Sequence, residues 1–568
     1  MARWIRDHRL VLCIAAAALL YLTGLGRPPL WEPDEGRYAE TAREMVVGGD
    51  YITPHNNFVR YFEKPPLLYW TTAASIKLLG VNEFAVRLPA AIASVGEVAV
   101  TEVLGELMFG VMAGIMAAIA LALSPLFFGF ARFATPDPLL AFFVTAAMAS
   151  FYMAAEAPEI GKGTGGRWMI ASAALLGLGT LTKGPVALAL GGAVALLWLV
   201  YEGRWRDIPR IPWLECVCVY LAITLPWFIL VARRNPGFLE FFLVHEHLHR
   251  YLANTEHEWG PWFFIPITVA GTWPWLLFVP LGVKGSASIA APSEPQDRRA
   301  IRFLLIWFGL IFVFFSIPRS KLGEYILPAI PALAMIAGRG IARTGELAEG
   351  MRRRLLAIFV AINAVMGVAA AIAILGFARY RLGAGLSHDA LIAVAALLGG
   401  AMVAFWLAHA RDNVPARIAA PLAIAMVIVM AAAMKAREDI APQVSRRNLA
   451  RTISPYIAGG CVLASYRHFE QSLPFYTGSR ETLVDYRGEL EPFGPARDPS
   501  GMVFATDAQL REIWGSTLCV ILIANRQDVP TLAKSLVPVP KPIGKEGKKV
   551  ALYKFSIGPE TRRCRMCE

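Results

Sequence analysis

The polar segment at residues 27–83 carries the residues best suited to chemistry, because it is rich in charge yet lies between two apolar stretches. Pro33 suits the first position of a helix, and the acidic residues after it suit the positive end of the helix dipole. On that helix Asp34, Arg37 and Tyr38 share one face. A carboxylate beside a guanidinium and a phenol can act on a charged substrate. The alternative is an amphipathic helix on a membrane surface.

The same segment continues through Tyr61, Glu63 and Lys64 to the pair Pro65-Pro66. Both prolines disfavour an α conformation just before them and suit the start of the next helix. Glu63 and Lys64 are therefore expected in an extended corner near a helix N-terminus, which is a ready anion site. A solvated charge pair is the alternative.

Three shorter polar turns repeat this pattern between apolar stretches. They carry Asp137, Lys183, and the group Lys321 with Tyr325. Each alone is typical of the end of a membrane span. Together, cations on the face that the topology rule disfavours indicate an anionic ligand, and a phosphate fits best.

Histidines cluster at residues 245–257, where four of the nine in the chain occur. On a helix His245 and His249 face one way and His247 the other, while Glu246 and Arg250 form an i, i+4 pair. The cluster predicts a divalent metal site, particularly if Glu63 joins it. Histidines that bind water and lipid headgroups are the alternative.

The elements that must position these residues are membrane helices. Of 568 residues, 56% are hydrophobic and 17% charged, and the mean hydropathy is +0.49. Soluble proteins have roughly 45–50% apolar and about 25% charged residues, so an ordinary soluble enzyme is excluded. The net charge of +12 need not indicate nucleic acid, because Lys and Arg in membrane proteins set topology and contact anionic lipid.

About thirteen transmembrane helices are predicted, the first beginning after Arg3, Arg6 and Arg9. The others are expected near residues 84–108, 111–128, 138–156, 168–181, 185–201, 213–232, 261–281, 301–316, 324–338, 355–377, 389–409 and 415–435. Lys and Arg concentrate in loops after even-numbered spans, which places the N-terminus in the cytoplasm and the C-terminal region outside.

Two domains are predicted: a membrane domain at residues 1–435, including the loop 27–83, and a small external α/β domain at residues 436–568. In the second domain, short apolar runs predict strands and alternate with helical stretches. The expected strands are 461–465, 502–505, 519–524 and 550–555, and the expected helices are 468–473, 507–514 and 531–536.

Several motifs resemble one known family. They are "WEPDEGRYAETAREMVVGGDYITPHNNFVRYFEKPPLLYW", "TPDPLLAF", "LTKGP", "FFLVHEHLHRY", "GTWPW" and "FFSIPRSKLGEYILPAIPALA". The chain is similar to the bacterial lipid A 4-amino-4-deoxy-L-arabinose transferases, GT-C glycosyltransferases related to protein O-mannosyltransferases. The resemblance covers most of the membrane part and implies the GT-C fold.

The resemblance also implies site residues. Asp34 would be the catalytic carboxylate and Asp137 a second acidic residue lining the cavity, while Tyr61 would line the pocket. Arg37, Lys64, Lys183, Arg250 and Tyr325 would hold the donor phosphate. Glu63 with His245, or else His247, would bind a divalent ion, zinc being the favoured one.

The predicted function is transfer of 4-amino-4-deoxy-L-arabinose from a polyprenyl phosphate to a lipid A phosphate at the periplasmic face of the bacterial inner membrane. An alternative acceptor is protein Ser or Thr, or another envelope glycan. A transporter or flippase fits less well, because the charges cluster at one rim and no inverted repeat is visible. Membrane lipid is the expected surrounding, without nucleic acid or an obligate protein partner.

Overall fold

The computed structural model describes residues 2–249, 258–284, 295–378, 384–408, 413–490 and 503–554. The chain forms two compact units. The transmembrane unit consists of Met1–Leu25, Glu63–Thr71 and Arg87–Asp439. The loop–sheet unit consists of Gly26–Phe62, Thr72–Val86 and Ile440–Glu568. The sequence prediction had grouped the loop 27–83 with the membrane helices, whereas most of this loop belongs to the same unit as the C-terminal residues.

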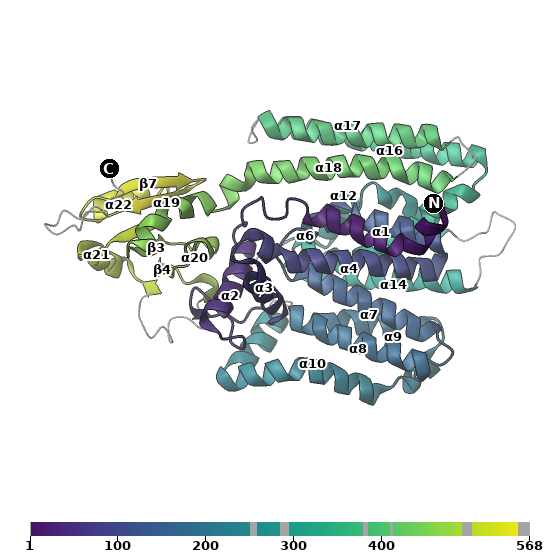
Figure 1. The fold of residues 1–568 in the computed structure, drawn as a ribbon, viewed down its shortest axis with the longest axis horizontal. Coiled ribbons are helices and arrows are strands. Elements are labelled where there is room, and N and C mark those ends of the chain that lie inside the picture. Colours follow the sequence, from purple (N-terminus) through teal and green to yellow (C-terminus); the bar gives the residue numbers. More distant parts are fainter. Residues whose placement is uncertain are drawn as a thin grey trace. The chain divides into compact units, whose positions relative to one another are not determined.

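The transmembrane unit is built from helices, many of which run roughly parallel in Figure 1. Its longer helices are α1 (Ala2–Leu22), α4 (Glu83–Phe109), α5 (Val111–Ala122), α7 (Asp137–Glu156), α8 (Gly163–Lys183), α9 (Val186–Tyr201), α10 (Trp213–Arg234), α14 (Pro295–Ser316), α15 (Ile330–Arg343), α16 (Glu349–Ala378), α17 (Ala384–Leu407) and α18 (Val414–Val444). Shorter ones are α6 (Pro125–Ala131), η1 (Trp205–Arg210), η2 (Glu240–His249), η3 (Pro261–Phe263), α12 (Phe264–Gly271), η4 (Trp275–Phe278), α13 (Val279–Val283), η5 (Gly323–Ala329) and η6 (Thr344–Glu346). The chain passes between the units within α3 (Leu67–Leu79), α4 and α18.

A helix occurs in the structure at every predicted span, which confirms a helical polytopic membrane protein. Seven helices among the described residues are long and apolar enough to cross a membrane, or up to nine if two bent pairs each count as one span. The bends are 65° between α5 and α6 and 94° in the Pro261–Val283 segment. The count falls below thirteen partly because α9 has only 16 residues, and a span normally needs about 20.

Close helix pairs define the core of the transmembrane unit. Helix α7 packs against α8, α5 against α15, and α8 also against α10. Aromatic rings fill the space among α7, α9 and α14, where Phe151, Trp198 and Phe303 lie with centroids 5.5 to 6.1 Å apart. Trp198 and Trp307 are both fully buried. On α7 these rings pack near the C-terminal end, whereas the predicted Asp137 is the first residue of that helix.

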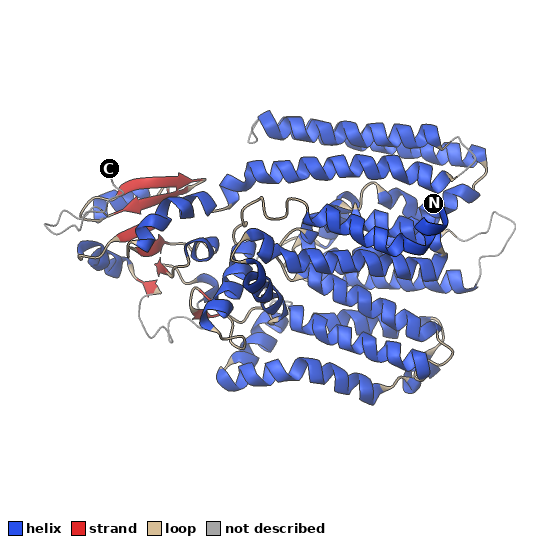
Figure 2. Cartoon of the chain, in the orientation of Figure 1, coloured by secondary structure: helices blue, strands red, loops and turns tan. Residues whose placement is uncertain are grey.

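All strands among the described residues belong to the loop–sheet unit, and Figure 2 draws them in red. Its six-stranded sheet has the order β5-β4-β3-β6-β8-β7. The strands are β3 (Val462–Tyr466), β4 (Glu481–Val484), β5 (Phe504–Ala505), β6 (Val520–Asn525), β7 (Lys541–Glu546) and β8 (Lys549–Tyr553). Strands β3, β4, β5 and β6 run parallel to one another, whereas β8 pairs antiparallel with β6 and with β7. The predicted α/β character of the C-terminal region is thus confirmed, and its sheet contains both parallel and antiparallel strands.

Both faces of this sheet are covered by helices. The helices are α19 (Arg447–Ala458), α20 (Ser472–Thr477), η7 (Gly488–Leu490), α21 (Asp507–Gly515) and α22 (Val529–Ser535). On one face Leu522 packs with Trp514 and Leu532, and on the other Ile521 packs with Ile453 and Leu473. Burial on both sides explains why β6 reads as a continuous apolar run.

The first loop contributes a helix and a hairpin to the same unit. Helix α2 spans Asp34–Gly48 and is buried along most of its length. Strands β1 (His55–Asn56) and β2 (Val59–Arg60) pair antiparallel. Their turn residues, Asn57 and Phe58, both have positive φ, as a two-residue hairpin turn requires. The Asn57 amide exchanges two hydrogen bonds with the backbone of Glu481, at 2.7 and 2.8 Å. This pairing joins the loop to strand β4.

A disulfide joins Cys461 to Cys519. These residues directly precede β3 and β6, which are adjacent parallel strands. The sequence analysis had assigned no role to them. A signal is present in the sequence, however, because a cysteine is the first residue of each of two predicted strands, 461–465 and 519–524.

Loss of this disulfide is expected to destabilise the loop–sheet unit by about 2–4 kcal/mol, because it closes a loop of 58 residues in the unfolded chain. Thermal unfolding of the full-length protein in detergent, with and without reductant, measures the effect. The double variant Cys461→Ser/Cys519→Ser should unfold at the lower temperature in both conditions. A further drop on adding reductant to this variant would contradict the assignment.

Candidate active site

The start of helix α2 brings together three residues predicted from the sequence. The Arg37 guanidinium lies 3.2 Å from the Asp34 carboxylate and donates a hydrogen bond of 3.2 Å to the Tyr61 hydroxyl. The carboxylate of Glu489, from η7, lies 2.9 Å from the same guanidinium. Asp34 is 44% exposed, whereas Arg37 is 10% exposed. The group therefore presents a carboxylate to solvent over a buried cation.

Backbone contacts to the C-terminal residues fix the entry to α2. The Glu32 carboxylate accepts hydrogen bonds from the backbone N–H of Ser472, at 2.8 Å, and from its hydroxyl. The Leu30 N–H donates to the Tyr476 hydroxyl at 2.8 Å. A Cβ at Gly36 would lie 2.6 Å from the Ser472 nitrogen, so only glycine permits this close approach of α2 to α20. Helix α20 thus holds the turn that carries Asp34.

Burial raises the pKa of Glu32 to about 8; the nearby Glu470 carboxylate adds to this, while hydrogen bonds from Ser472 and the Arg446 charge oppose it. Glu470 itself lies within 2.6 Å of Lys549 and also pairs with Arg446. At neutral pH, Glu32 is therefore largely protonated in the folded protein. The attachment of α2 rests on a carboxyl group that titrates near physiological pH.

The folded state is expected to lose stability as pH rises from about 4.5 to 8. Glu32 has a raised pKa in the folded protein, so the folded state binds the proton more tightly than the unfolded state. Thermal unfolding should occur at lower temperature at pH 9 than at pH 6. Glu32→Gln should shrink this difference, because a neutral amide oxygen can still accept the Ser472 bonds. Glu512→Gln, at an exposed site on α21, is the control, and equal pH dependence in both variants would contradict the explanation.

The transmembrane unit brings together a second set of predicted residues. Asp137 is the first residue of α7, and Lys183 is the last residue of α8. Their side chains form an ion pair, and they are only 4% and 15% exposed. The Lys183 ammonium also lies 4.4 Å from the centre of the Tyr325 ring, a cation–π distance. Two of the predicted residues, Asp137 and Tyr325, thus contact the buried positive charge of a third, Lys183.

A third set surrounds Lys64. Its ammonium lies 4.0 Å from the Glu63 carboxylate and 3.6 Å from that of Glu246. Among the described residues, no three His, Cys, Asp or Glu side chains gather closely enough to hold a metal ion. The side chains of His245 and His247 lie outside the described set, as does Arg250. Their predicted roles therefore stay predictions.

The remaining predicted residues are engaged elsewhere. Lys321 is 1% exposed, and its ammonium donates to the carbonyl of Pro318 and, at 3.0 Å, to that of Trp259. In the described structure the Lys321 side chain therefore stabilises the turn in which it lies. Tyr38 is 6% exposed, and the Arg37 guanidinium lies 6.0 Å from its ring centre. The Tyr38 ring therefore lies next to the Arg37 side chain.

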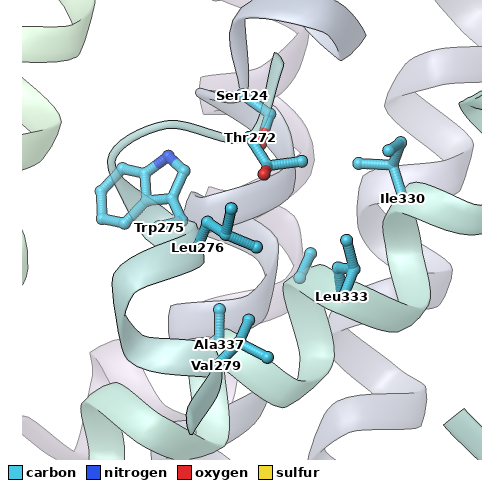
Figure 3. Close-up of a pocket in the computed structure, with 9 residues that line it drawn as sticks. Ser124, Thr272, Trp275, Leu276, Val279, Ile330, Leu333 and Ala337 are labelled. Atoms are coloured by element: carbon cyan, nitrogen blue, oxygen red, sulfur yellow. The ribbon is translucent and has the colours of Figure 1, made fainter. Parts of the chain in front are cut away.

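A cavity in the transmembrane unit does not qualify as the site. It lies where the bent segment of η4 meets α15, and Figure 3 shows it lined by Trp275, Leu276, Ile330 and Leu333. Its volume is about 10 Å³, close to the minimum for one water. The hydroxyls of Ser124 and Thr272 donate hydrogen bonds to backbone carbonyls of the helices that precede them, α5 and α12. This apolar gap cannot hold a sugar.

Comparison with known proteins connects these clusters to a family. Residues 63–230 match the family model described as dolichyl-phosphate-mannose-protein mannosyltransferase. Residues 449–554 match the aminoarabinose transferase C-terminal domain. The undecaprenyl phosphate-α-4-amino-4-deoxy-L-arabinose arabinosyl transferase of Erwinia tasmaniensis is 34% identical over 404 residues, 69% of each chain. This chain belongs to that family of arabinosyl transferases.

Other members of the arabinosyl transferase family agree with this assignment. The Yersinia pestis protein of the same description is 32% identical over 372 residues, 65% of each chain. ArnT from Cupriavidus metallidurans, solved with bound undecaprenyl phosphate, has 28% identity and a TM-score of 0.85, covering 97% of this chain and 99% of that one. The apo structure of the same protein has 26% identity and a TM-score of 0.84, and the match covers 97% of this chain and 98% of that one. The predicted family and enzyme class, a glycosyltransferase that uses a polyprenyl-phosphate sugar, are confirmed, and the transporter alternative is set aside.

Proposed function

We propose that this membrane enzyme transfers 4-amino-4-deoxy-L-arabinose from undecaprenyl phosphate to a phosphate group of lipid A. The observation that carries the proposal is the likeness to ArnT along 97% of the chain. The described structure supports it with three cations, Arg37, Lys64 and Lys183, each paired with a carboxylate. Cations in such settings suit a substrate whose reacting group is a phosphate.

The reaction requires that the departing polyprenyl phosphate be stabilised as it gains negative charge. Preorganised cations in a site shielded from water supply this stabilisation, because they need no reorganisation when the charge develops. Lys183 is held between Asp137 and the Tyr325 ring, and Lys64 is held between Glu63 and Glu246. We assign both to the donor phosphate. The family resemblance implies the same assignment for Arg37, which within the loop–sheet unit contacts Asp34.

The role of Asp34 depends on the acceptor. A hydroxyl acceptor needs a general base, and an exposed carboxylate suits that task. A phosphate monoester with a second pKa of about 6 is already a dianion at neutral pH. For that acceptor, Asp34 would orient Arg37 and stabilise the positive charge that develops on the sugar.

The proposal includes a divalent ion, for which zinc suits a mixed set of carboxylate and imidazole ligands. Glu63 and a histidine, His245 or His247, would hold it. The fit rests on Glu63 and Glu246, whose carboxylates already approach one cation, the Lys64 ammonium. A bound ion would supply further positive charge to the leaving phosphate.

We also propose that the N-terminus is cytoplasmic, and that the first loop and the C-terminal domain are periplasmic in the bacterial inner membrane. The Cys461–Cys519 disulfide supports this orientation, because disulfides persist in the periplasm and are rare in the cytosol. The N-terminal Arg3, Arg6 and Arg9 support it independently through the positive-inside rule.

Mass spectrometry of lipid A, from cells with and without this protein, tests the proposal. A mass gain of one amino-pentose on a lipid A phosphate is expected only when the protein is present. Unchanged lipid A together with newly glycosylated protein would overturn the proposed acceptor. That outcome would favour a protein acceptor, which the match of residues 63–230 to a protein mannosyltransferase model makes the leading alternative.

A further inference from the structure

We propose that Glu489, in the C-terminal part of the loop–sheet unit, is a positioning residue for the transfer reaction, because it holds the Arg37 guanidinium beside Tyr61 and Asp34. The inference rests on the proposed function, in which Arg37 and Asp34 take part. It extends that function by giving the C-terminal sheet domain a place in the chemistry.

The contacts form a closed arrangement around one guanidinium. The Arg37 Nη1 lies 2.9 Å from Glu489 Oε2 and 3.2 Å from the Tyr61 hydroxyl, while its Nη2 lies 3.2 Å from Asp34 Oδ1. The Tyr61 hydroxyl lies 3.4 Å from the same Glu489 oxygen. The Glu489 carboxylate therefore contacts both Arg37 and Tyr61, from a position 428 residues beyond Tyr61 in the sequence.

The charge balance shows what Glu489 does for Asp34. One guanidinium lies between two carboxylates, so its positive charge offsets only part of their combined negative charge, and the field at Asp34 stays more negative than in an isolated ion pair. Without Glu489, Arg37 would have Asp34 as the nearer carboxylate, three residues away on the same helix. The guanidinium would then turn toward Asp34 and away from Tyr61. Glu489 in this way sets both the direction of Arg37 and the charge available on Asp34.

The neighbouring residue Leu490 holds the backbone at Glu489 in place. A positioning role of the Glu489 side chain can therefore be tested separately from a role in folding. Leu490 is 1% exposed and packs in a cluster with Val59, Tyr61 and Leu483. The Glu489 side chain is 29% exposed, and it contacts that cluster at the hydroxyl of Tyr61. Replacing Glu489 should therefore alter the chemistry with little change in folding, whereas Leu490→Ala should alter folding.

The test compares purified full-length variants with a synthetic undecaprenyl phosphate-linked aminoarabinose and lipid A. Glu489→Ala is expected to lower kcat/KM by about tenfold, as loss of a hydrogen bond to a charged group does. The fall should lie mainly in kcat, because Glu489 is proposed to act through Arg37 and not through donor binding. Glu489→Gln, which keeps an oxygen acceptor, should fall between Ala and wild type, and the unfolding temperature of both should match wild type. Glu512→Gln serves as the control.

A double-mutant cycle with Arg37 decides between a positioning and a structural role. If Glu489 acts through Arg37, adding Glu489→Ala to Arg37→Ala should change the rate less than twofold. Independent, multiplying losses would overturn the proposal, as would wild-type activity of Glu489→Ala. A wild-type protein that transfers nothing from this donor would instead contradict the proposed function, which makes the two failures distinguishable.

Discussion

Replacing Asp34 by Asn is expected to abolish sugar transfer to hydroxyl acceptors and only to weaken transfer to phosphate acceptors. General-base catalysis contributes about 10²–10⁴-fold, and an amide cannot accept the proton of a hydroxyl. A phosphate dianion needs no base. With phosphate, the variant loses only the charge that the exposed Asp34 carboxylate places next to Arg37.

Purified enzyme with one lipid-linked donor and two acceptors, one hydroxyl and one phosphate, measures this difference directly. Asp528→Asn, at a partly exposed position just before α22, controls for the loss of one negative charge elsewhere in the same unit. Equal and complete loss with both acceptors would show that Asp34 is needed for a step common to the two reactions, and the base assignment would then be wrong.

Removing Lys183 is expected to give the largest loss of stability. Lys183→Met leaves the Asp137 carboxylate, 4% exposed, without its ammonium partner. Breaking one side of a buried ion pair costs about 3–5 kcal/mol, because the remaining charge stays desolvated. Transfer activity should be lost as well, since the variant also lacks the cation assigned to the donor phosphate.

The double variant Asp137→Asn/Lys183→Met separates the two effects. It should regain most of the unfolding temperature, because neither a lone charge nor an ion pair remains, and it should stay inactive. Thermal unfolding in detergent and donor turnover are the two measurements. Recovery of activity together with stability would contradict a role for Lys183 beyond structure.

Local patterns in the sequence were sufficient to predict much of this molecule. Apolar runs marked the membrane helices, and spacing on one helix face predicted that Asp34 and Arg37 would meet. In the C-terminal domain, β3 and β6 were predicted because their residues are buried on both sides and strongly apolar. Strand β7, Lys541-Pro-Ile-Gly-Lys-Glu546, was missed because an edge strand exposed to solvent keeps no such pattern.

Partners distant in the sequence could not be predicted in the same way. Asp137 and Lys183 were each placed at a rim, yet their pairing depends on how α7 packs against α8. Glu489 lies in a polar stretch with Gly488 that reads as an ordinary turn. No residue adjacent to Glu489 in the sequence indicates a contact with Arg37, because this contact forms only when the first loop folds with the sheet.

The attachment of α2 to α20 sets an order of events during synthesis. Glu32 and Ser472 are 440 positions apart, so the turn before Asp34 is made long before the residues that hold it. Until α20 and strand β4 have emerged, the hydrogen bonds to Glu32 and Asn57 have no partners. A partly synthesised chain therefore has its membrane helices without an assembled first loop. We therefore expect the enzyme to become active only after α20 and β4 have been synthesised. Before that point, a nascent chain should not consume its lipid-linked substrate.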